Sequence, residues 1–201
     1  MAGIENPILL DLPVPIRTKR LVLRPIAPGN GGAMNEAISE SLPELAPWLD
    51  WATSAPTPEQ SEELARTFAA NFILRSALVF LMWREDRLIG RCALYDFNWK
   101  IPSAELGYWI RTSESGKGYM TESISALAIY AFRHIGLRRL VLGCFDENLK
   151  STAIAQRLGF TLESRAACAS YNSSSKSLCT WRTYVRLNAD GLDDAGVSWG
   201  A

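Results

Sequence analysis

The segment from Ser113 to Ser123, with the sequence SESGKGYMTES, constrains this chain more than any other. An apolar run from Ala104 to Ile110 precedes it and indicates a buried strand. Behind it, apolar residues recur at the spacing of one helix face: Ile124, Leu127, Ala128, Ala131, Phe132 and Ile135. A strand, a glycine loop and a helix N-terminus in this order make an anion site, because the backbone can approach the ligand and the first helical N–H groups lack partners. The segment therefore predicts an anion site, and much of the functional reading depends on whether that anion is a pyrophosphate.

The composition narrows the class of protein. A chain of 201 residues with 48% hydrophobic residues favours one domain with a real core, with or without tails. Twenty-one basic residues balance 21 acidic ones, which argues against nucleic acid as the main partner. The four cysteines show no metal-like spacing beside a single histidine, so no metal site is expected. With no signal peptide in the first residues and no membrane-length apolar run, we expect a soluble protein of the reducing cytoplasm.

The order of elements predicts a mixed α/β fold. We expect an N-terminal arm over residues 1–15, a main domain over 16–187 and a loose polar tail over 188–201. Strands are expected at 20–26, 77–84, 88–97, 104–110, 139–145, 161–167 and 178–187, and helices at 33–41, 58–76, 119–134 and 148–158. Residues 45–51 are expected to form a structured connection without regular structure. The glycines of the loop do not fit the dinucleotide-binding fingerprint GxGxxG.

Five segments together resemble the GCN5-related N-acetyltransferases (GNAT), and within them the RimJ/RimL branch. They are TKRLVLR at 18–24, APWLDW at 46–51, ELGYWI at 105–110, GKGYMTE at 116–122, and NLKSTA at 148–153 followed by LGF at 158–160. The resemblance covers roughly residues 16 to 187 as an order of elements. It implies a mostly antiparallel central sheet with helices on both faces, and acetyl-CoA as the acetyl donor.

The family's cofactor signature, Gln/Arg-x-x-Gly-x-Gly/Ala, aligns with Ser115, the central Gly118 and Met120. Two of its three specified positions therefore depart from the pattern. Backbone donors need no particular side chain, so the resemblance still implies pyrophosphate binding through the N–H groups of Gly116, Lys117, Gly118, Tyr119, Met120 and Thr121. Lys117 is also expected to add positive charge at the phosphates.

The resemblance implies direct attack of a primary amine on the acetyl thioester. Glu105 is the candidate general base, and the alternatives are a carboxylate that orients the substrate or an ion-pair partner of an arginine. The strand from Gly107 to Ile110 is expected to hold the pantetheine arm through Tyr108, Trp109 and Ile110. A backbone N–H of Tyr108 or Trp109 is the expected donor to the carbonyl oxygen.

Asn148 and Ser151 open the next predicted helix and lie three residues apart on one face. In the family the asparagine holds pantetheine and the serine can protonate the leaving thiolate. The alternatives are a helix N-cap for Asn148 and a first-turn polar residue for Ser151. A thiolate with a pKa of about 8.5 leaves readily without strong acid help. His134 is expected to cap a helix end, and the cysteines to fill the core.

The aromatic residues expected to flank the acceptor are Trp48, Trp51, Tyr95, Phe97 and Trp99. The segment around Trp48 is close to the RimL pattern, which favours the α-amino group of a protein N-terminus. A pKa of about 8 for an α-amine, against about 10.4 for lysine, supports the same acceptor. The alternatives are a small amine such as an aminoacyl-nucleotide antibiotic, and a non-catalytic acyl-CoA-binding regulator. A homodimer is plausible for this branch.

Overall fold

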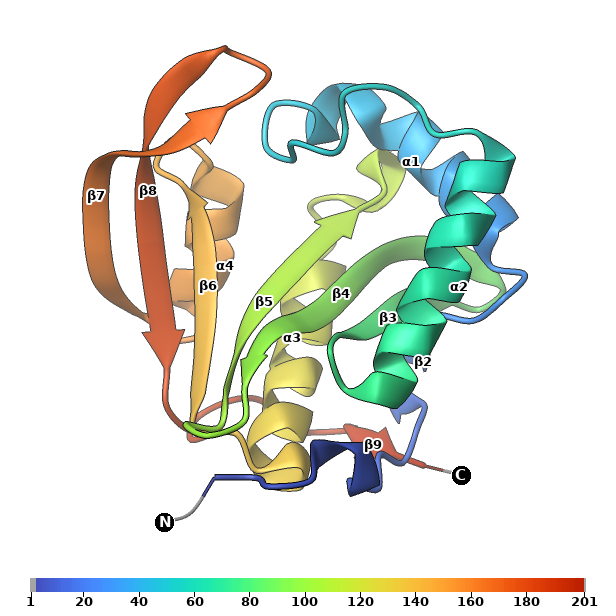
Figure 1. Cartoon of the computed structure of the whole chain (residues 1–201), viewed down its shortest axis with the longest axis vertical. Coiled ribbons are helices and arrows are strands. Elements are labelled where there is room, and N and C mark those ends of the chain that lie inside the picture. Colours follow the sequence, from blue (N-terminus) through green and yellow to red (C-terminus); the bar gives the residue numbers. More distant parts are fainter. Residues whose placement is uncertain (1–2, 201) are drawn as a thin grey trace.

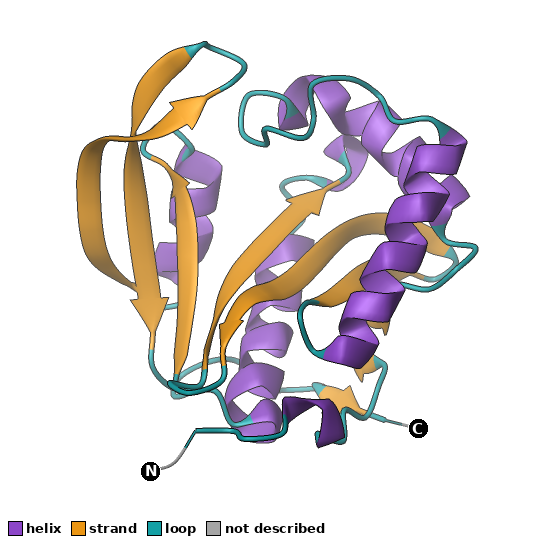
Figure 2. Ribbon diagram, viewed as in Figure 1, coloured by secondary structure: helices purple, strands orange, loops and turns teal. Residues whose placement is uncertain are grey.

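A nine-stranded mixed sheet forms the centre of the computed structural model, which describes residues 3–200 (Figures 1 and 2). The strands are β1 Ile16–Arg17, β2 Val22–Pro25, β3 Leu78–Arg84, β4 Arg87–Asn98, β5 Ser103–Ile110, β6 Arg139–Phe145, β7 Thr161–Asn172, β8 Ser177–Arg186 and β9 Ser198–Trp199. The helices are α1 Gly31–Leu45, α2 Pro58–Leu74, α3 Tyr119–Tyr130 and α4 Leu149–Arg157. Short 3₁₀ turns lie at η1 Pro7–Leu9 and η2 Thr112–Glu114, and one π turn, η3 Ala131–Ile135, extends α3.

The sheet divides between β5 and β6. The strand order is β7-β8-β6-β5-β4-β3-β2-β1-β9. Within residues 3–200, only the β5–β6 pair is parallel. Its register joins Ser103–Leu106 to Arg139–Leu142, and no strand pairing continues beyond it. The two strands therefore splay apart toward their carboxyl ends, as Figure 1 shows. From residue 107 onward, β5 has an edge without a strand partner, and this edge lies where the site is built.

Helices cover both faces of the sheet, as expected. Leu106, Leu140 and Ile124 belong to one core cluster, which includes most of α3 and the inner side of α4. Ile38, Leu81 and Trp109 belong to a second cluster, on the face covered by α1 and α2. Since side chains alternate along a strand, residues 106, 108 and 110 of β5 face α3 and α4, and residues 105, 107 and 109 face α1 and α2.

Local signals place most helix ends. Thr57 caps α2 with a capping box to Gln60, and Gly136 ends the α3–η3 unit at a φ of 84°. At the end of α4, Gly159 N–H donates to Gln156 O and Phe160 N–H to Ala155 O, the expected Schellman motif. His134 lies in the last turn, where its Nε2 bonds Asp11 O at 2.8 Å.

Two expectations were wrong. The helix expected at 33–41 runs from Gly31 to Leu45, so it takes up the start of the expected connection. The tail expected to be loose is packed: Ser198–Trp199 pairs with β1, and Ala189 and Leu192 are 7% and 8% exposed. The tail is held by a strand partner distant in sequence, which its polar composition does not reveal. Of the cysteines, Cys92 and Cys144 fill the core as expected, whereas Cys168 is exposed and Cys179 is half-buried.

Candidate active site

A cavity of about 1000 Å³ lies between the diverging ends of β5 and β6. Its wall takes residues from the glycine loop, from the start of α3 and α4, and from the end of α1. It brings together most of the predicted site residues, namely Trp48, Tyr95, Glu105, Tyr108, Trp109, Ile110, Ser115, Gly116, Gly118, Tyr119, Met120, Thr121, Asn148 and Ser151. One cavity thus joins the predicted cofactor residues to the predicted acceptor residues.

Four predicted site residues lie outside the cavity wall, namely Trp51, Phe97, Trp99 and Lys117. Trp51 is 45% exposed in the connection after α1. Trp99 stacks on Phe97, with ring centroids 4.4 Å apart, and packs against the core. The ammonium group of Lys117 lies 3.0 Å from Glu114 Oε2, so in this structure its charge is already paired.

The glycine loop offers backbone donors to an anion. Gly116 and Gly118 have φ angles of 78° and 81°, which residues with a side chain rarely adopt. The first intrahelical bond runs from Glu122 N–H to Gly118 O, so the N–H groups of Tyr119, Met120 and Thr121 have no partner within the helix. The side chain of Met120, which departs from the small residue of the signature, is buried in the core cluster below the loop. It therefore leaves the backbone accessible.

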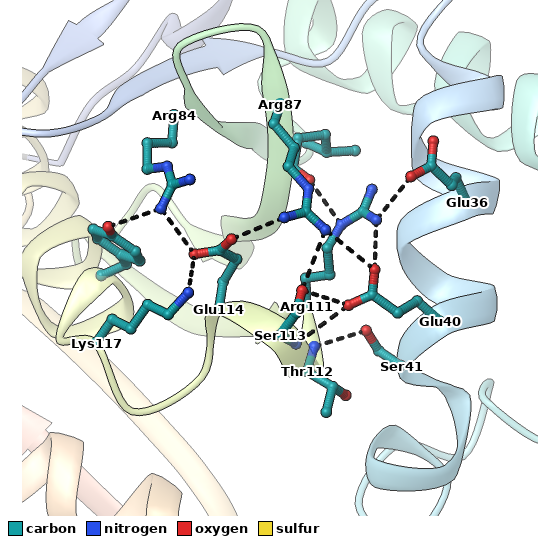
Figure 3. Close-up of polar contacts among 12 residues, drawn as sticks. Glu36, Glu40, Ser41, Arg84, Arg87, Arg111, Thr112, Ser113, Glu114 and Lys117 are labelled. Carbon is teal, nitrogen blue, oxygen red and sulfur yellow. Dashed lines mark hydrogen bonds and ion pairs between the residues drawn. The ribbon is translucent and has the colours of Figure 1, made fainter.

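A buried carboxylate anchors this loop from behind (Figure 3). Glu114 has a side chain only 2% exposed, and three cations surround it: Arg84 at 3.2 Å, Arg87 at 3.0 Å and Lys117 at 3.0 Å. Arg84 also donates to the hydroxyl of Tyr119 at 3.2 Å. The loop is thereby tied to the β3–β4 hairpin on one side and to the start of α3 on the other.

A second cluster ties η2 to α1 (Figure 3). Glu40 accepts from Arg111 at 2.6 Å and from the N–H and hydroxyl of Ser113 at 3.2 and 2.6 Å. Burial raises the pKa of Glu40, but the bonds from Ser113 and Arg111 prevail and lower it to about 2. Ser41 accepts from Thr112 N–H at 3.0 Å. These contacts hold η2, which leads into the glycine loop, against α1, whose C-terminal end lines the cavity.

Cationic residues that the sequence reasoning missed also lie at the cavity. Arg20 lies over the Tyr119 ring at 4.4 Å and donates to Lys117 O at 3.1 Å. Arg157 of α4 donates to Thr121 Oγ1 at 3.1 Å, and Lys150 lines the same wall. Arg20 falls within a segment quoted for the family resemblance, but its position before a strand carries no signal of a ligand contact.

The free edge of β5 points N–H and C=O groups into the split. Arg111 N–H donates to Ile89 O of the neighbouring strand at 2.8 Å. Because bonding direction alternates along an antiparallel ladder, Trp109 also faces β4, and the backbone groups of Tyr108 and Ile110 face the split. Of the two expected donors, Tyr108 therefore has the free N–H.

Gly107 of β5 leaves room for an aromatic ring. A Cβ at Gly107 would lie 2.4 Å from the ring of Tyr95, so the ring occupies the space that a side chain there would need. Gly143 of β6 shows the same arrangement, with a Cβ 2.5 Å from the ring of Trp181. Trp181 lines the cavity and was missed, because its pairing with Phe145, which brings its ring beside Gly143, emerges only from the strand register. Tyr95 and Trp181 together form aromatic walls on the face that carries Glu105.

Glu105 lies between these walls. It pairs in register with Tyr95 and is half-buried in the cavity. Burial, followed by the nearby negative charge of Asp96, raises the pKa of its carboxyl above the ordinary value.

The start of α4 lies across the split from Tyr108. Asn148 Oδ1 accepts from Ser151 N–H at 3.0 Å, so Asn148 is the N-cap of α4. The side chain of Ser151 is bonded to the hydroxyl of Tyr108, with the two oxygens 2.8 Å apart. At the far end of the cavity, the β7–β8 hairpin reaches the connection after α1, where Asn172 Nδ2 donates to Pro47 O at 2.8 Å. In Figure 1 the tip of the β7–β8 hairpin and the connection after α1 approach each other across the split.

Comparison with known proteins supports the resemblance found in the sequence. The family model of the acetyltransferase (GNAT) domain matches residues 20–161. The chain belongs to the GNAT acetyltransferases. The ribosomal-protein-serine acetyltransferase of Escherichia coli strain K12 is 34% identical over 120 residues, which are 58% of this chain and 67% of that protein.

Solved structures agree. RimL, a ribosomal L7/L12 alpha-N-protein acetyltransferase in complex with coenzyme A, matches with a TM-score of 0.79 at 25% identity, over 86% of this chain and 96% of that one. The microcin C7 self-immunity acetyltransferase MccE, in complex with acetyl-CoA and AMP, matches with a TM-score of 0.79 at 20% identity, over 85% and 93%. At that identity the likeness is one of fold.

The protein is an acetyl-CoA-dependent N-acetyltransferase of the RimL type. The site fits this cofactor, since unpaired N–H groups at the helix start and a free strand edge open into one cavity. Across residues 3–200, no group of three His, Cys, Asp or Glu side chains could hold a metal ion. In the same range, no helix has the length and apolar character to span a membrane.

Proposed function

We propose that this enzyme acetylates the α-amino group of a protein N-terminus. The observation that carries the proposal is Glu105, a half-buried carboxylate with a raised pKa that lines the cavity on the same face of the sheet as Tyr95. A carboxylate with a raised pKa is a stronger base than an ordinary one. It requires an acceptor that gives up a proton easily. An α-amine, with a pKa of about 8, does so far better than a lysine, with a pKa of about 10.4.

The residues divide the work across β5. When bound, acetyl-CoA supplies the acetyl group as a thioester. Glu105 takes the proton of the incoming ammonium group on the α1–α2 face. The Tyr108 N–H donates to the carbonyl oxygen at the free edge of β5, where negative charge develops. The N–H groups at the start of α3 hold the pyrophosphate. Asn148 supports the pantetheine arm from α4.

The acceptor class also has support from a relative. The Escherichia coli protein, at 34% identity, is named for a serine of a ribosomal protein. Trp48, Tyr95 and Trp181 give this chain an aromatic acceptor end that suits the first residues of a peptide, because aromatic faces bind apolar and backbone groups alike.

An acceptor screen tests the proposal. Coenzyme A release would be measured with serine-starting peptides, the same peptides with a blocked N-terminus and one internal lysine, and aminoacyl-nucleotides. We expect kcat/KM for the free N-terminus to exceed that of the lysine peptide at least tenfold at pH 7. Faster acetylation of the lysine peptide or of an aminoacyl-nucleotide would overturn the assignment of the acceptor.

A further inference from the structure

A hydroxyl pair lies on the opposite face of β5 from Glu105. Tyr108 Oη and Ser151 Oγ are 2.8 Å apart, and both residues line the cavity. Ser151 is 8% exposed, and its backbone is fixed by the bond to Asn148. The base and this pair therefore flank the free end of β5, one on each face. An amine that arrives beside Glu105 pushes the leaving group toward the pair.

Burial keeps the Tyr108 member of this hydroxyl pair protonated. It raises the pKa of the Tyr108 phenol above its ordinary value, so the phenol keeps its proton throughout the working pH range. Two titratable groups act on Tyr108: the Cys144 thiol of β6, and the Tyr95 phenol of β4 from the opposite face of the sheet. Burial also raises the pKa of both, that of Tyr95 to about 12, so neither is charged at pH 7. At 2.8 Å either hydroxyl can be the donor, and when the protonated phenol donates to Ser151 Oγ the serine hydrogen is free for another acceptor.

We propose that Tyr108 orients the Ser151 hydroxyl to donate a hydrogen bond to the sulfur atom as the thioester breaks. The inference rests on the proposed acetyl transfer. In that step the amine nitrogen bonds the carbonyl carbon, the carbon–sulfur bond breaks, and sulfur keeps the electron pair. The proton lost by the amine leaves through Glu105. Tyr108 acts through Ser151 and is a positioning residue.

In this arrangement Ser151 is a hydrogen-bond donor that keeps its proton. A thiolate with a pKa of about 8.5 is too weak a base to deprotonate serine backed by a phenol whose own pKa exceeds about 10. The thiolate therefore leaves as an anion and takes a proton from water. Removing a preorganised donor to a developing charge costs roughly 100-fold to 1000-fold in kcat. Loss of the tyrosine that orients it is expected to cost about tenfold.

The first test reads the bound thiol directly and needs no acceptor. Ultraviolet absorbance of the thiolate would be titrated with coenzyme A bound to the full chain, against desulfo-coenzyme A as the blank. We expect a thiol pKa below the free value of about 8.5 in the wild type, and a return toward that value in Tyr108→Phe and in Ser151→Ala. The matched control is Tyr130→Phe, because the hydroxyl of Tyr130 is buried without a partner and away from the cavity wall.

The second test is a double-mutant cycle on turnover. Tyr108→Phe is expected to lower kcat about tenfold with KM for acetyl-CoA changed less than twofold, and adding it to Ser151→Ala should cost nothing more. The proposed coupling of Tyr108 to Ser151 would be overturned if the kcat losses of the two variants multiply in the double variant. It would also be overturned if neither variant changes the pKa of the bound thiol. Failure of coenzyme A to bind the wild type would instead count against the acetyl-transfer function. If Tyr108→Phe does not fold, the titration of Ser151→Ala decides.

Discussion

At the scale of single residues, the half-buried carboxylate of Glu105 lowers the stability of the fold at neutral pH and makes a stronger base available. Burial raises the pKa of its carboxyl, so the folded protein holds that proton more tightly than the unfolded chain does. The stability this contributes is fully present below the ordinary pKa of about 4.3 and is lost as pH rises through the folded value. Above that pH the carboxylate destabilises the fold and is available as a base.

Glu105→Gln is therefore expected to be a slower and a more stable enzyme at neutral pH. A general base contributes about 100-fold or more, so kcat/KM at pH 7 should fall by that order, with the loss shrinking as higher pH frees the amine. The melting temperature should exceed that of the wild type at pH 8 and match it below pH 4. Glu63→Gln, on the exposed side of α2, is the control for both measurements. Full activity of Glu105→Gln at pH 7 would exclude the base.

At the scale of elements, the glycine loop depends on Glu114, whose buried carboxylate holds Arg84, Arg87 and Lys117. Glu114→Gln keeps the shape and removes the charge. We expect KM for acetyl-CoA to rise about tenfold, or ~1.4 kcal/mol, with kcat little changed, because the loop positions the cofactor and not the reacting atoms. The free energy of unfolding should fall by about 1 to 3 kcal/mol.

The control for this substitution is a carboxylate that anchors a loop elsewhere. Glu62 accepts from the N–H groups of Gly29 and Gly31 at the start of α1, and pairs with Arg66. Glu62→Gln should lower stability without a change in KM. An equal rise in KM in both variants would show that general loosening of the fold, and not the loop contact, controls cofactor affinity.

Elements with a local period could be predicted from the sequence, and contacts between distant elements could not. The spacing of Ile124 and Leu127 specifies α3, and Gly159 with Phe160 specifies the end of α4, because these signals act within a few residues. Trp181 and Arg20 reach the cavity only through strand order and packing. Lys117 was expected at the phosphates, but its partner Glu114 was not foreseen, since a buried carboxylate in a polar loop leaves no periodic trace.

At the scale of the whole molecule, the cavity joins two parts of one sheet. Strands β1 to β5 and β9 lie on one side of the split, and β6 to β8 on the other. They are connected through the short register of Ser103–Leu106 with Arg139–Leu142 and through contacts such as that between Asn172 and Pro47. A ligand held by α3, by β5 and by α4 at once bridges the two parts. It must therefore stabilise the native state against global unfolding.

Acetyl-CoA at one hundred times its dissociation constant should add about 2.7 kcal/mol to the free energy of unfolding. For a chain of this size that corresponds to a rise in melting temperature of roughly 5 to 10 °C. S-acetylpantetheine, which has the thioester arm but lacks the pyrophosphate, should give a much smaller rise at the same concentration, because the donors at the start of α3 then have no anion to bind. Equal shifts for the two ligands would show that the loop from Ser113 to Ser123 contributes no affinity. Scanning calorimetry of the full chain measures both.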